Sequence, residues 1–308
     1  MNEHIVVLLS TYFGEKYIRQ QLDCIIEQDF PGQITVVIRD DGSRDGTCAI
    51  IRQMELPENR QVIVHECANA GPQRSFLELI RLAPEADYYF FADQDDVWDL
   101  DKLRLGADQL RPMGDTPAAQ GANFRLSDMD LNIYDPAAIK EPPRFTPLST
   151  LFYNKIPGCC MSFNRALMAL CKQLQLPNVM MHDSMVLCLA AAVGTVLYDP
   201  ESRIIHRIHR DNVVGDGHKK IVLHKWIPEK LKLVLKKEDY DVSLMAAEFL
   251  RVAEDRMHPP YREDLILLRD FKKSLGNTFA LLRHPDTKGK WTDRTVMSIR
   301  SKILLHIF

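Results

Sequence analysis

The feature that most constrains the fold is an alternation of β-rich and helical segments over the first hundred residues. Four apolar runs rich in β-branched or aromatic residues start 26 to 29 residues apart, at Ile5–Leu9, Ile34–Ile38, Val62–His65 and Tyr88–Ala92. Segments between them space their apolar residues as helices do. Strands that alternate with helices form βαβ units around a mostly parallel sheet. We therefore predict an α/β fold.

Several elements can be placed within this pattern. One helix carries Ile18, Leu22 and Ile25 on one face, and Ser75 is expected to cap another helix. Beyond residue 112 we predict strands and helices at the following ranges: strands at Gly121–Leu126, Gly158–Phe163, Thr195–Tyr198 and Arg203–His206, and helices at Arg165–Leu174 and His182–Val193.

Polar and acidic side chains follow three of the predicted strands. Thr11 comes after the first strand, Asp40 and Asp41 after the second, and Asp93 after the fourth. In open α/β sheets, ligands bind beyond the carboxyl ends of the strands. We expect these residues to converge on one edge of the sheet.

The strongest single element is the acidic sequence DQDD at 93–96. Carboxylates beside a buried strand are costly unless a positive group accompanies them. A divalent cation, Mg²⁺ or Mn²⁺, would relieve the repulsion. The alternative is that Asp95 or Asp96 caps a helix beginning near Val97.

A second element, DDGSRDGT at 40–47, follows the second strand. Its adjacent carboxylates are suited to accept hydrogen bonds from a base ring and a ribose hydroxyl. A turn closed by its own Asp or Ser side chains explains the same residues.

Three ordered motifs together carry a family resemblance, which covers residues 4–215. They are Leu8–Ile18, Arg39–Thr47 and Phe91–Trp98. They resemble the family-2 glycosyltransferases, whose nucleotide-sugar-binding fold is called GT-A. The chain is most similar in type to the bacterial branch that builds surface polysaccharides, including rhamnosyltransferases.

The resemblance implies roles for individual residues. Thr11, Asp40 and Asp41 would line the pocket for uracil or thymine and ribose, with the aspartate that meets the base left open. Asp93 would contact the ribose or the metal, and Asp95 would hold the cation on the donor diphosphate. Asp96 would support the ligands or cap a helix.

The family is inverting and needs a base for the acceptor hydroxyl, usually an Asp preceded by an acidic residue. Here the matching place has His182 before Asp183. The resemblance implies Asp183 as the base, and the alternative is a helix N-cap. His182 receives no role.

The resemblance extends to a closing segment in which a His precedes Asn-Val-Val-Gly. His209 matches that His and is expected to contact the donor or the metal, while Arg207 or Arg210 would neutralise diphosphate charge. The alternative is an exposed polar loop. Gly158 matches a segment on the acceptor side, and Trp98 is expected either to stack on a sugar or to pack in the core.

The C-terminal part of the chain is basic. Residues 1–217 hold 20 Lys and Arg against 30 Asp and Glu, whereas residues 218–308 hold 19 against 12. We predict a GT-A domain over 1–217 and a basic helical region over 218–308. Basic amphipathic segments at 219–237 and 288–308 would either lie on an anionic membrane or pack on the catalytic domain.

The family resemblance and the acidic motifs together imply metal-dependent, inverting transfer of a hexose or deoxyhexose from a UDP- or dTDP-sugar to a glycan, including a lipid-linked one. No nucleic-acid partner is expected. The rival interpretations are a nucleotidyltransferase and a non-catalytic scaffold. Seven scattered cysteines and a first strand at Ile5 favour a cytoplasmic protein without a secretory signal, peripheral to the inner face of the membrane where its acceptor is lipid-linked.

Overall fold

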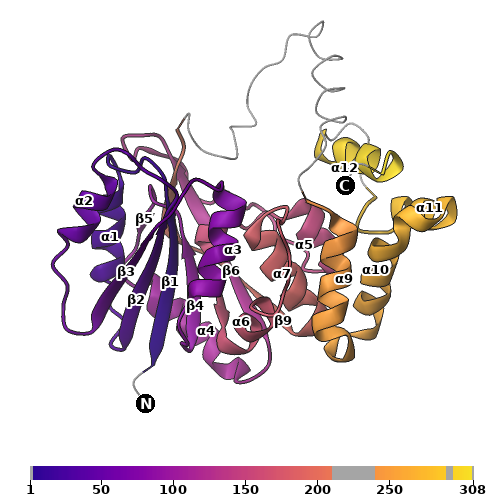
Figure 1. Ribbon diagram of the computed structural model, residues 1–308, viewed down its shortest axis with the longest axis horizontal. Helices are drawn as coiled ribbons and strands as arrows, with labels where there is room; N and C mark the ends of the chain where they lie inside the picture. Colours follow the sequence, from indigo (N-terminus) through magenta and orange to yellow (C-terminus); the bar gives the residue numbers. More distant parts are fainter. Residues whose placement is uncertain (1–2, 210–239, 289–293, 307–308) are drawn as a thin grey trace, which may run out of the picture. The chain divides into compact units, whose positions relative to one another are not determined.

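In the computed structural model of the protein, the described residues (3–209, 240–288 and 294–306) include nine strands that form one mixed sheet (Figure 1). Eight of them lie in the order β3-β2-β1-β4-β8-β6-β9-β5, and β7 pairs with β6. The strands are β1 (His4–Thr11), β2 (Gln33–Asp40), β3 (Arg60–Glu66), β4 (Tyr88–Ala92), β5 (Val97–Trp98), β6 (Ala118–Ser127), β7 (Ile133–Asp135), β8 (Met161–Asn164) and β9 (Thr195–Arg207).

The four strands predicted first form the parallel part of the sheet. β2 pairs with β3 and β1, and β1 pairs with β4, all in parallel. Residues Ile5–Leu9 of β1 are fully buried on both faces, as in a parallel sheet covered by helices on either side. The helices of this part of the chain are α1 (Ile18–Ile26), α2 (Thr47–Arg52), α3 (Pro72–Leu82), α4 (Lys102–Leu110) and α6 (Arg165–Cys171).

The start of α3 differs from the prediction. The sequence predicts Ser75 as its N-cap, but the helix begins at Pro72 and Ser75 lies inside it. Proline is favoured in the first turn because its fixed φ suits a helix and its missing N–H needs no partner there. The hydroxyl of Ser75 instead contacts that of Ser10 at 2.7 Å.

No helix begins directly after the acidic motif. Val97 and Trp98 form β5, which pairs antiparallel with Ile205 and Ile204 of β9. Asp95 and Asp96 therefore cap no helix, because the pairing of β-branched Val97 and aromatic Trp98 with β9 outweighs the local capping signal.

The two short strands predicted near the end of the sheet are one strand, β9. The pairing between β6 and β9 shifts register between Asp199 and Ser202. Pro200 lies in this irregularity, where its lack of a backbone N–H costs no ladder hydrogen bond.

The chain divides into two compact units. The sheet belongs to the first, which comprises residues 1–143, 155–173 and 194–209, and the remaining residues form the second. The described helices of the second unit are α5 (Pro147–Tyr153), α7 (His182–Val193), α9 (Val242–Ala253), α10 (Pro259–Asp270), α11 (Leu275–Arg283) and α12 (Arg294–Leu304).

This division differs from the predicted boundary at 217/218. α5 and α7 precede that boundary, yet they belong to the second unit. Every residue of α7 is buried, and such a helix must be surrounded by other elements. α7 packs against α5 and α10, contacts that no local pattern reveals. No helix among the described residues has the length and apolar character needed to cross a membrane.

Candidate functional site

The carboxyl ends of β1, β2 and β4 bring the predicted polar residues to one edge of the sheet. Thr11 is paired in register with Asp40. Leu9 is paired with Ala92, the residue before the acidic motif. The expected convergence is confirmed, because neighbouring parallel strands end at the same edge.

Gln94, which the sequence analysis passed over, joins two of these strand ends. Its Oε1 accepts hydrogen bonds from the Thr11 hydroxyl at 2.7 Å and from the Tyr12 amide at 2.9 Å. Its Nε2 donates to the Tyr12 carbonyl at 3.1 Å. A Cβ added at Gly14 would lie 2.4 Å from Gln94 Oε1, so glycine permits this close approach. Gln94 thus fixes the loop after β1 against the acidic motif.

The carboxylates of Asp40 and Asp41 are both engaged within the protein. Asp40 accepts hydrogen bonds from the amide and hydroxyl of Ser43, at 2.8 and 2.5 Å. Asp41 pairs with Arg39 and accepts from the amides of Ala70 and Gly71. Both aspartates are buried and organise the backbone turns that follow β2 and β3.

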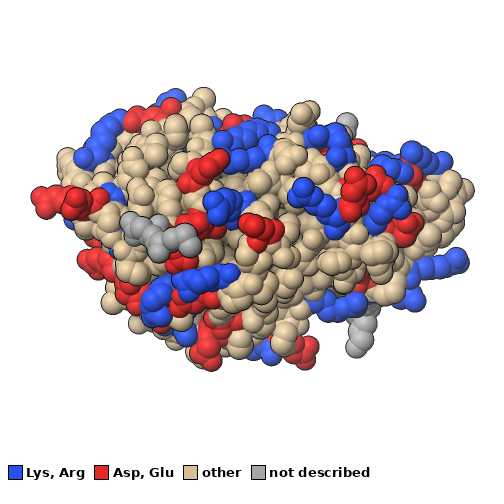
Figure 2. All heavy atoms as spheres, turned by 90° about the horizontal axis from the view of Figure 1, so that it is seen from below, with Lys and Arg blue, Asp and Glu red and all other residues tan. Residues whose placement is uncertain are grey.

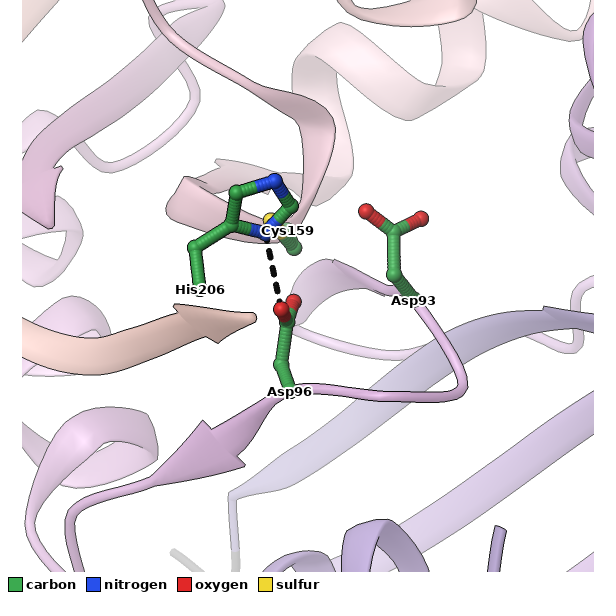
Figure 3. Close-up of side chains that lie close together, drawn as sticks. All are labelled: Asp93, Asp96, Cys159 and His206. Atoms are coloured by element: carbon green, nitrogen blue, oxygen red, sulfur yellow. Dashed lines mark hydrogen bonds and ion pairs between the residues drawn. The ribbon is translucent and has the colours of Figure 1, made fainter. Parts of the chain in front are cut away.

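The acidic motif meets two histidines of the distant closing segment. Asp95 Oδ2 lies 2.6 Å from His209 Nε2, and Asp96 Oδ1 lies 2.8 Å from His206 Nδ1. Asp93, Asp96, Cys159 and His206 each place one ligand-type atom within 4.8 Å of the others (Figure 3). Asp96 Oδ2 is buried and has no hydrogen-bond partner among the described residues.

Burial and mutual repulsion dominate the electrostatics of this motif. Burial first, and then the neighbouring carboxylates, raise the pKa values of Asp93 and Asp95. Burial alone would lower the pKa of His206, but the charges of Asp96 and Asp93 outweigh it and raise that pKa to about 10. The motif therefore attracts positive charge.

Arg207 is buried, and its guanidinium nitrogens donate hydrogen bonds to other residues of the protein. Its Nε donates to the Asp95 carbonyl at 3.0 Å, and its two terminal nitrogens donate to the Met129 carbonyl and to Gln20 Oε1. These contacts hold the end of β9 against the acidic motif. Arg210, the other arginine predicted to face a diphosphate, lies outside the described residues.

The sequence of residues 6–169 matches the profile described as Glycosyl transferase family 2, a match that spans more than half of the chain. The chain belongs to glycosyl transferase family 2. The predicted family is thereby confirmed, and the nucleotidyltransferase interpretation is rejected.

This glycosyltransferase is similar in sequence to two bacterial transferases. The chain is 27% identical over 222 residues to the dTDP-rhamnosyl transferase RfbG of Shigella flexneri, covering 67% of this chain and 73% of RfbG. It is 29% identical over 99 residues to the putative teichuronic acid biosynthesis glycosyltransferase TuaG of Bacillus subtilis, covering 32% of this chain and 38% of TuaG.

Solved structures share the fold. The TarS 1–349 fragment of Staphylococcus aureus in complex with UDP-GlcNAc superposes with a TM-score of 0.56 at 16% identity, covering 96% of this chain and 81% of TarS 1–349. The mannosyltransferase PcManGT of Pyrobaculum calidifontis, in complex with GDP-Man and Mn²⁺, gives 0.52 at 18% identity, with coverages of 99% and 76%. The predicted GT-A fold is confirmed.

The acidic motif of this glycosyltransferase fits a divalent cation. Asp93, Asp96 and His206 cluster with Cys159, and Asp96 Oδ2 has no hydrogen-bond partner among the described residues. Asp95 and His209 form a second carboxylate–imidazole pair from the same two segments. Hydrogen bonding to Cys160, together with burial, raises the pKa of the Cys159 thiol well above its usual value. A bound cation displaces the proton of a thiol or imidazole that it ligates, so Cys159 and His206 stay in the set of ligand atoms with the carboxylates.

Two residues predicted on the acceptor side lie in the core of the first unit. Trp98 is 3% exposed, and the Lys102 ammonium lies 4.6 Å from its ring centroid. Of the two roles left open by the sequence, packing accounts for what the structure shows. Gly158 is buried in a 3₁₀ turn (Gly158–Cys160) that precedes β8, where the sequence predicts a strand. It is adjacent to Cys159 in the acidic cluster.

The predicted base, Asp183, lies in the second unit, in the first turn of α7. It is buried, and its Oδ1 accepts a hydrogen bond from the Ser184 amide. Burial lowers the pKa of the neighbouring His182 to about 3. His182 is therefore neutral at physiological pH.

His206, Gln94 and Tyr17 also lie at this edge, although the sequence motifs predicted no role for them. Tyr17 stacks on His209 with 5.3 Å between ring centroids. The sequence signals were the position of Gln94 inside the acidic motif, that of His206 three residues before His209, and that of Tyr17 inside the motif Leu8–Ile18.

Proposed function

We propose that this glycosyltransferase transfers a hexose or deoxyhexose from a UDP- or dTDP-sugar to a glycan hydroxyl in bacterial surface polysaccharide synthesis. The observation that carries the proposal is the pairing of Asp95 with His209 at the edge where β1, β2 and β4 end. Similarity to the dTDP-rhamnosyl transferase RfbG and to the putative teichuronic acid biosynthesis glycosyltransferase TuaG supports the pathway class, and the UDP-GlcNAc complex of TarS supports a nucleotide-sugar donor.

The donor is proposed to bind along this edge. Thr11, Asp40 and Asp41 would border the base and ribose, with the two aspartates shaping the pocket through the loops they hold. Asp93 would meet the ribose or the cation. The buried carboxylates disfavour a bare diphosphate, so a cation is required between the two sets of negative charge.

Mn²⁺ is the proposed cation, with Mg²⁺ as the alternative. Asp95 and His209 would hold it, and a set that mixes carboxylate with imidazole suits Mn²⁺ better than Mg²⁺, which prefers oxygen alone. When bound, the cation would stabilise the negative charge that develops on the leaving diphosphate. The complex of PcManGT with GDP-Man and Mn²⁺ supports this choice.

Asp183 is the proposed base. The acceptor oxygen attacks the anomeric carbon as the bond from that carbon to the diphosphate oxygen breaks, which inverts the configuration. The acceptor hydroxyl proton passes to the Asp183 carboxylate. Neutral His182 adds no positive charge beside that carboxylate.

The acceptor is proposed to be a lipid-linked glycan, reached through peripheral contact with an anionic membrane surface. Residues 271–288, which precede the basic segment at 288–308, contain four Lys or Arg, of which Lys272 pairs with Asp241 and Lys273 with Asp270. Leu275 and Phe279 of α11 are 72% and 47% exposed beside these basic residues. Figure 2 shows Lys and Arg side chains (blue) spread over the face that it displays, with Asp and Glu (red) among them. The basic segment at 219–237 lies outside the described residues.

The test is a donor screen by calorimetry with UDP-, dTDP- and GDP-sugars, with and without Mn²⁺, on the parent protein and on Asp95→Ala. One nucleotide class should bind only with Mn²⁺, and Asp95→Ala should lose that binding. Binding that is equally tight in EDTA would reject the metal-dependent donor site. No binding of any nucleotide would favour the scaffold interpretation.

A further inference from the structure

β9 is paired with β6 up to its last residue, and this pairing ends two residues before His209. Arg207 is the last residue of β9, and the Ile208 amide makes one more backbone hydrogen bond, to the Ser127 carbonyl at 2.9 Å. His209 follows outside the ladder. Rotation about the last bond of a histidine side chain is broadly tolerated. The direction of the His209 ring therefore depends on what its faces contact.

Tyr17, at the N-terminus of α1, supplies such a contact. Its ring and that of His209 are stacked, with centroids 5.3 Å apart and planes 18° apart. The Arg207 guanidinium carbon lies 5.0 Å from the same Tyr17 centroid, within the range of a cation–π interaction. The Arg207 guanidinium also donates a hydrogen bond to Gln20 Oε1 of α1, at 2.8 Å. The start of α1 therefore contacts both Arg207 and His209.

We infer that Tyr17 is a positioning residue that holds the His209 imidazole with Nε2 directed at Asp95, so that the pair is preorganised for the cation. This inference rests on the proposed function. The stack fixes the ring plane, and the 2.6 Å contact between Nε2 and Oδ2 fixes the rotation within that plane. Groups that orient a metal ligand typically change metal affinity by about 10–100-fold when removed.

The test measures Mn²⁺ affinity by electron paramagnetic resonance in the presence of UDP. Tyr17→Leu should weaken binding about 10-fold. Tyr17→Phe, which keeps the stacking ring, should restore it to near the parent value. Tyr134→Leu, an exposed tyrosine of β7, serves as the matched control and should change nothing. In a His209→Ala background, Tyr17→Leu should have no further effect.

An equal loss of affinity with and without His209 would overturn the inference, since Tyr17 would then act independently of that ring. A second readout works without metal: the ring current of Tyr17 should displace the His209 signal in ¹H–¹³C spectra recorded in EDTA, and Tyr17→Leu should abolish the displacement. If the parent protein binds no Mn²⁺, the proposed cation fails, whereas an unmoved His209 signal rejects the stack itself.

Discussion

The imidazole Nε2 of His209 lies 2.6 Å from Oδ2 of Asp95, although 114 positions separate the two residues in the sequence. Asp95 follows β4 of the parallel part of the sheet, and His209 follows β9. This contact links the acidic motif at 93–96 to the segment that follows β9.

This pair predicts that His209→Ala weakens Mn²⁺ binding by at least about 10-fold, since one of two proposed ligands is lost. Calorimetry with Mn²⁺ and UDP measures the change. The control is Asp264→Asn, which disrupts a separate cluster of Asp264, His284 and Asp286 in the second unit. A loss of affinity in the control instead would place the measured cation in the second unit.

Gln94→Ala should reduce the free energy of unfolding by about 1–3 kcal/mol, because the buried Thr11 hydroxyl and the Tyr12 amide lose their shared acceptor. Urea unfolding followed by circular dichroism measures this. Gln53→Ala, at an exposed position after α2, is the matched control and should be close to neutral. Equal stability of the two variants would show that Gln94 does not link the loops in solution.

Trp98→Ala should destabilise the protein by about 3–5 kcal/mol, as expected for a large buried ring. Trp98→Phe should retain most of that stability and leave the KM for the acceptor unchanged. A raised acceptor KM in Trp98→Phe, with normal stability, would indicate instead that Trp98 stacks on a sugar of the acceptor.

Asp183→Asn should lower the transfer rate by about 10²–10⁴-fold, the usual contribution of a general base. Donor affinity should stay at the parent value, because the donor is proposed to bind at the edge of the first unit. Transfer assays and donor calorimetry on the same preparation separate the two effects. A rate within a few-fold of the parent would exclude Asp183 as the base.

His182 predicts a pH dependence of stability. Its pKa is about 3 in the folded protein, below the 6.5 of an exposed ring, so the unfolded chain binds a proton that the folded protein does not. The resulting stability is present above about pH 6.5 and is lost as the pH falls toward 3, by about 1.4 kcal/mol per pH unit. Urea unfolding between pH 6 and 4.5 should be less pH-dependent in His182→Gln. Parallel slopes would contradict the prediction.

The sequence predicted the strand–helix alternation and the converging strand ends because both are encoded locally. Apolar spacing marks strands and helices, and parallel strands must end at a common edge. The resemblance implied that Asp95 holds a cation and that His209 contacts the donor or the metal; the structure shows the two side chains in contact, and their roles as ligands stay a prediction. The same local signals were insufficient for Ser75 and Val97, where a neighbouring Pro72 and a distant strand decided the outcome.

By itself, the sequence determined the α/β class, the family and the edge of the sheet where the acidic residues lie, since these follow from periodicity and short motifs. Only the tertiary structure decided that Tyr17 stacks on His209, that Gln94 holds Thr11, that Trp98 is core and that α7 belongs with the later helices. Each of these depends on packing between segments far apart in the sequence, and no local pattern specifies which distant side chain a residue will contact.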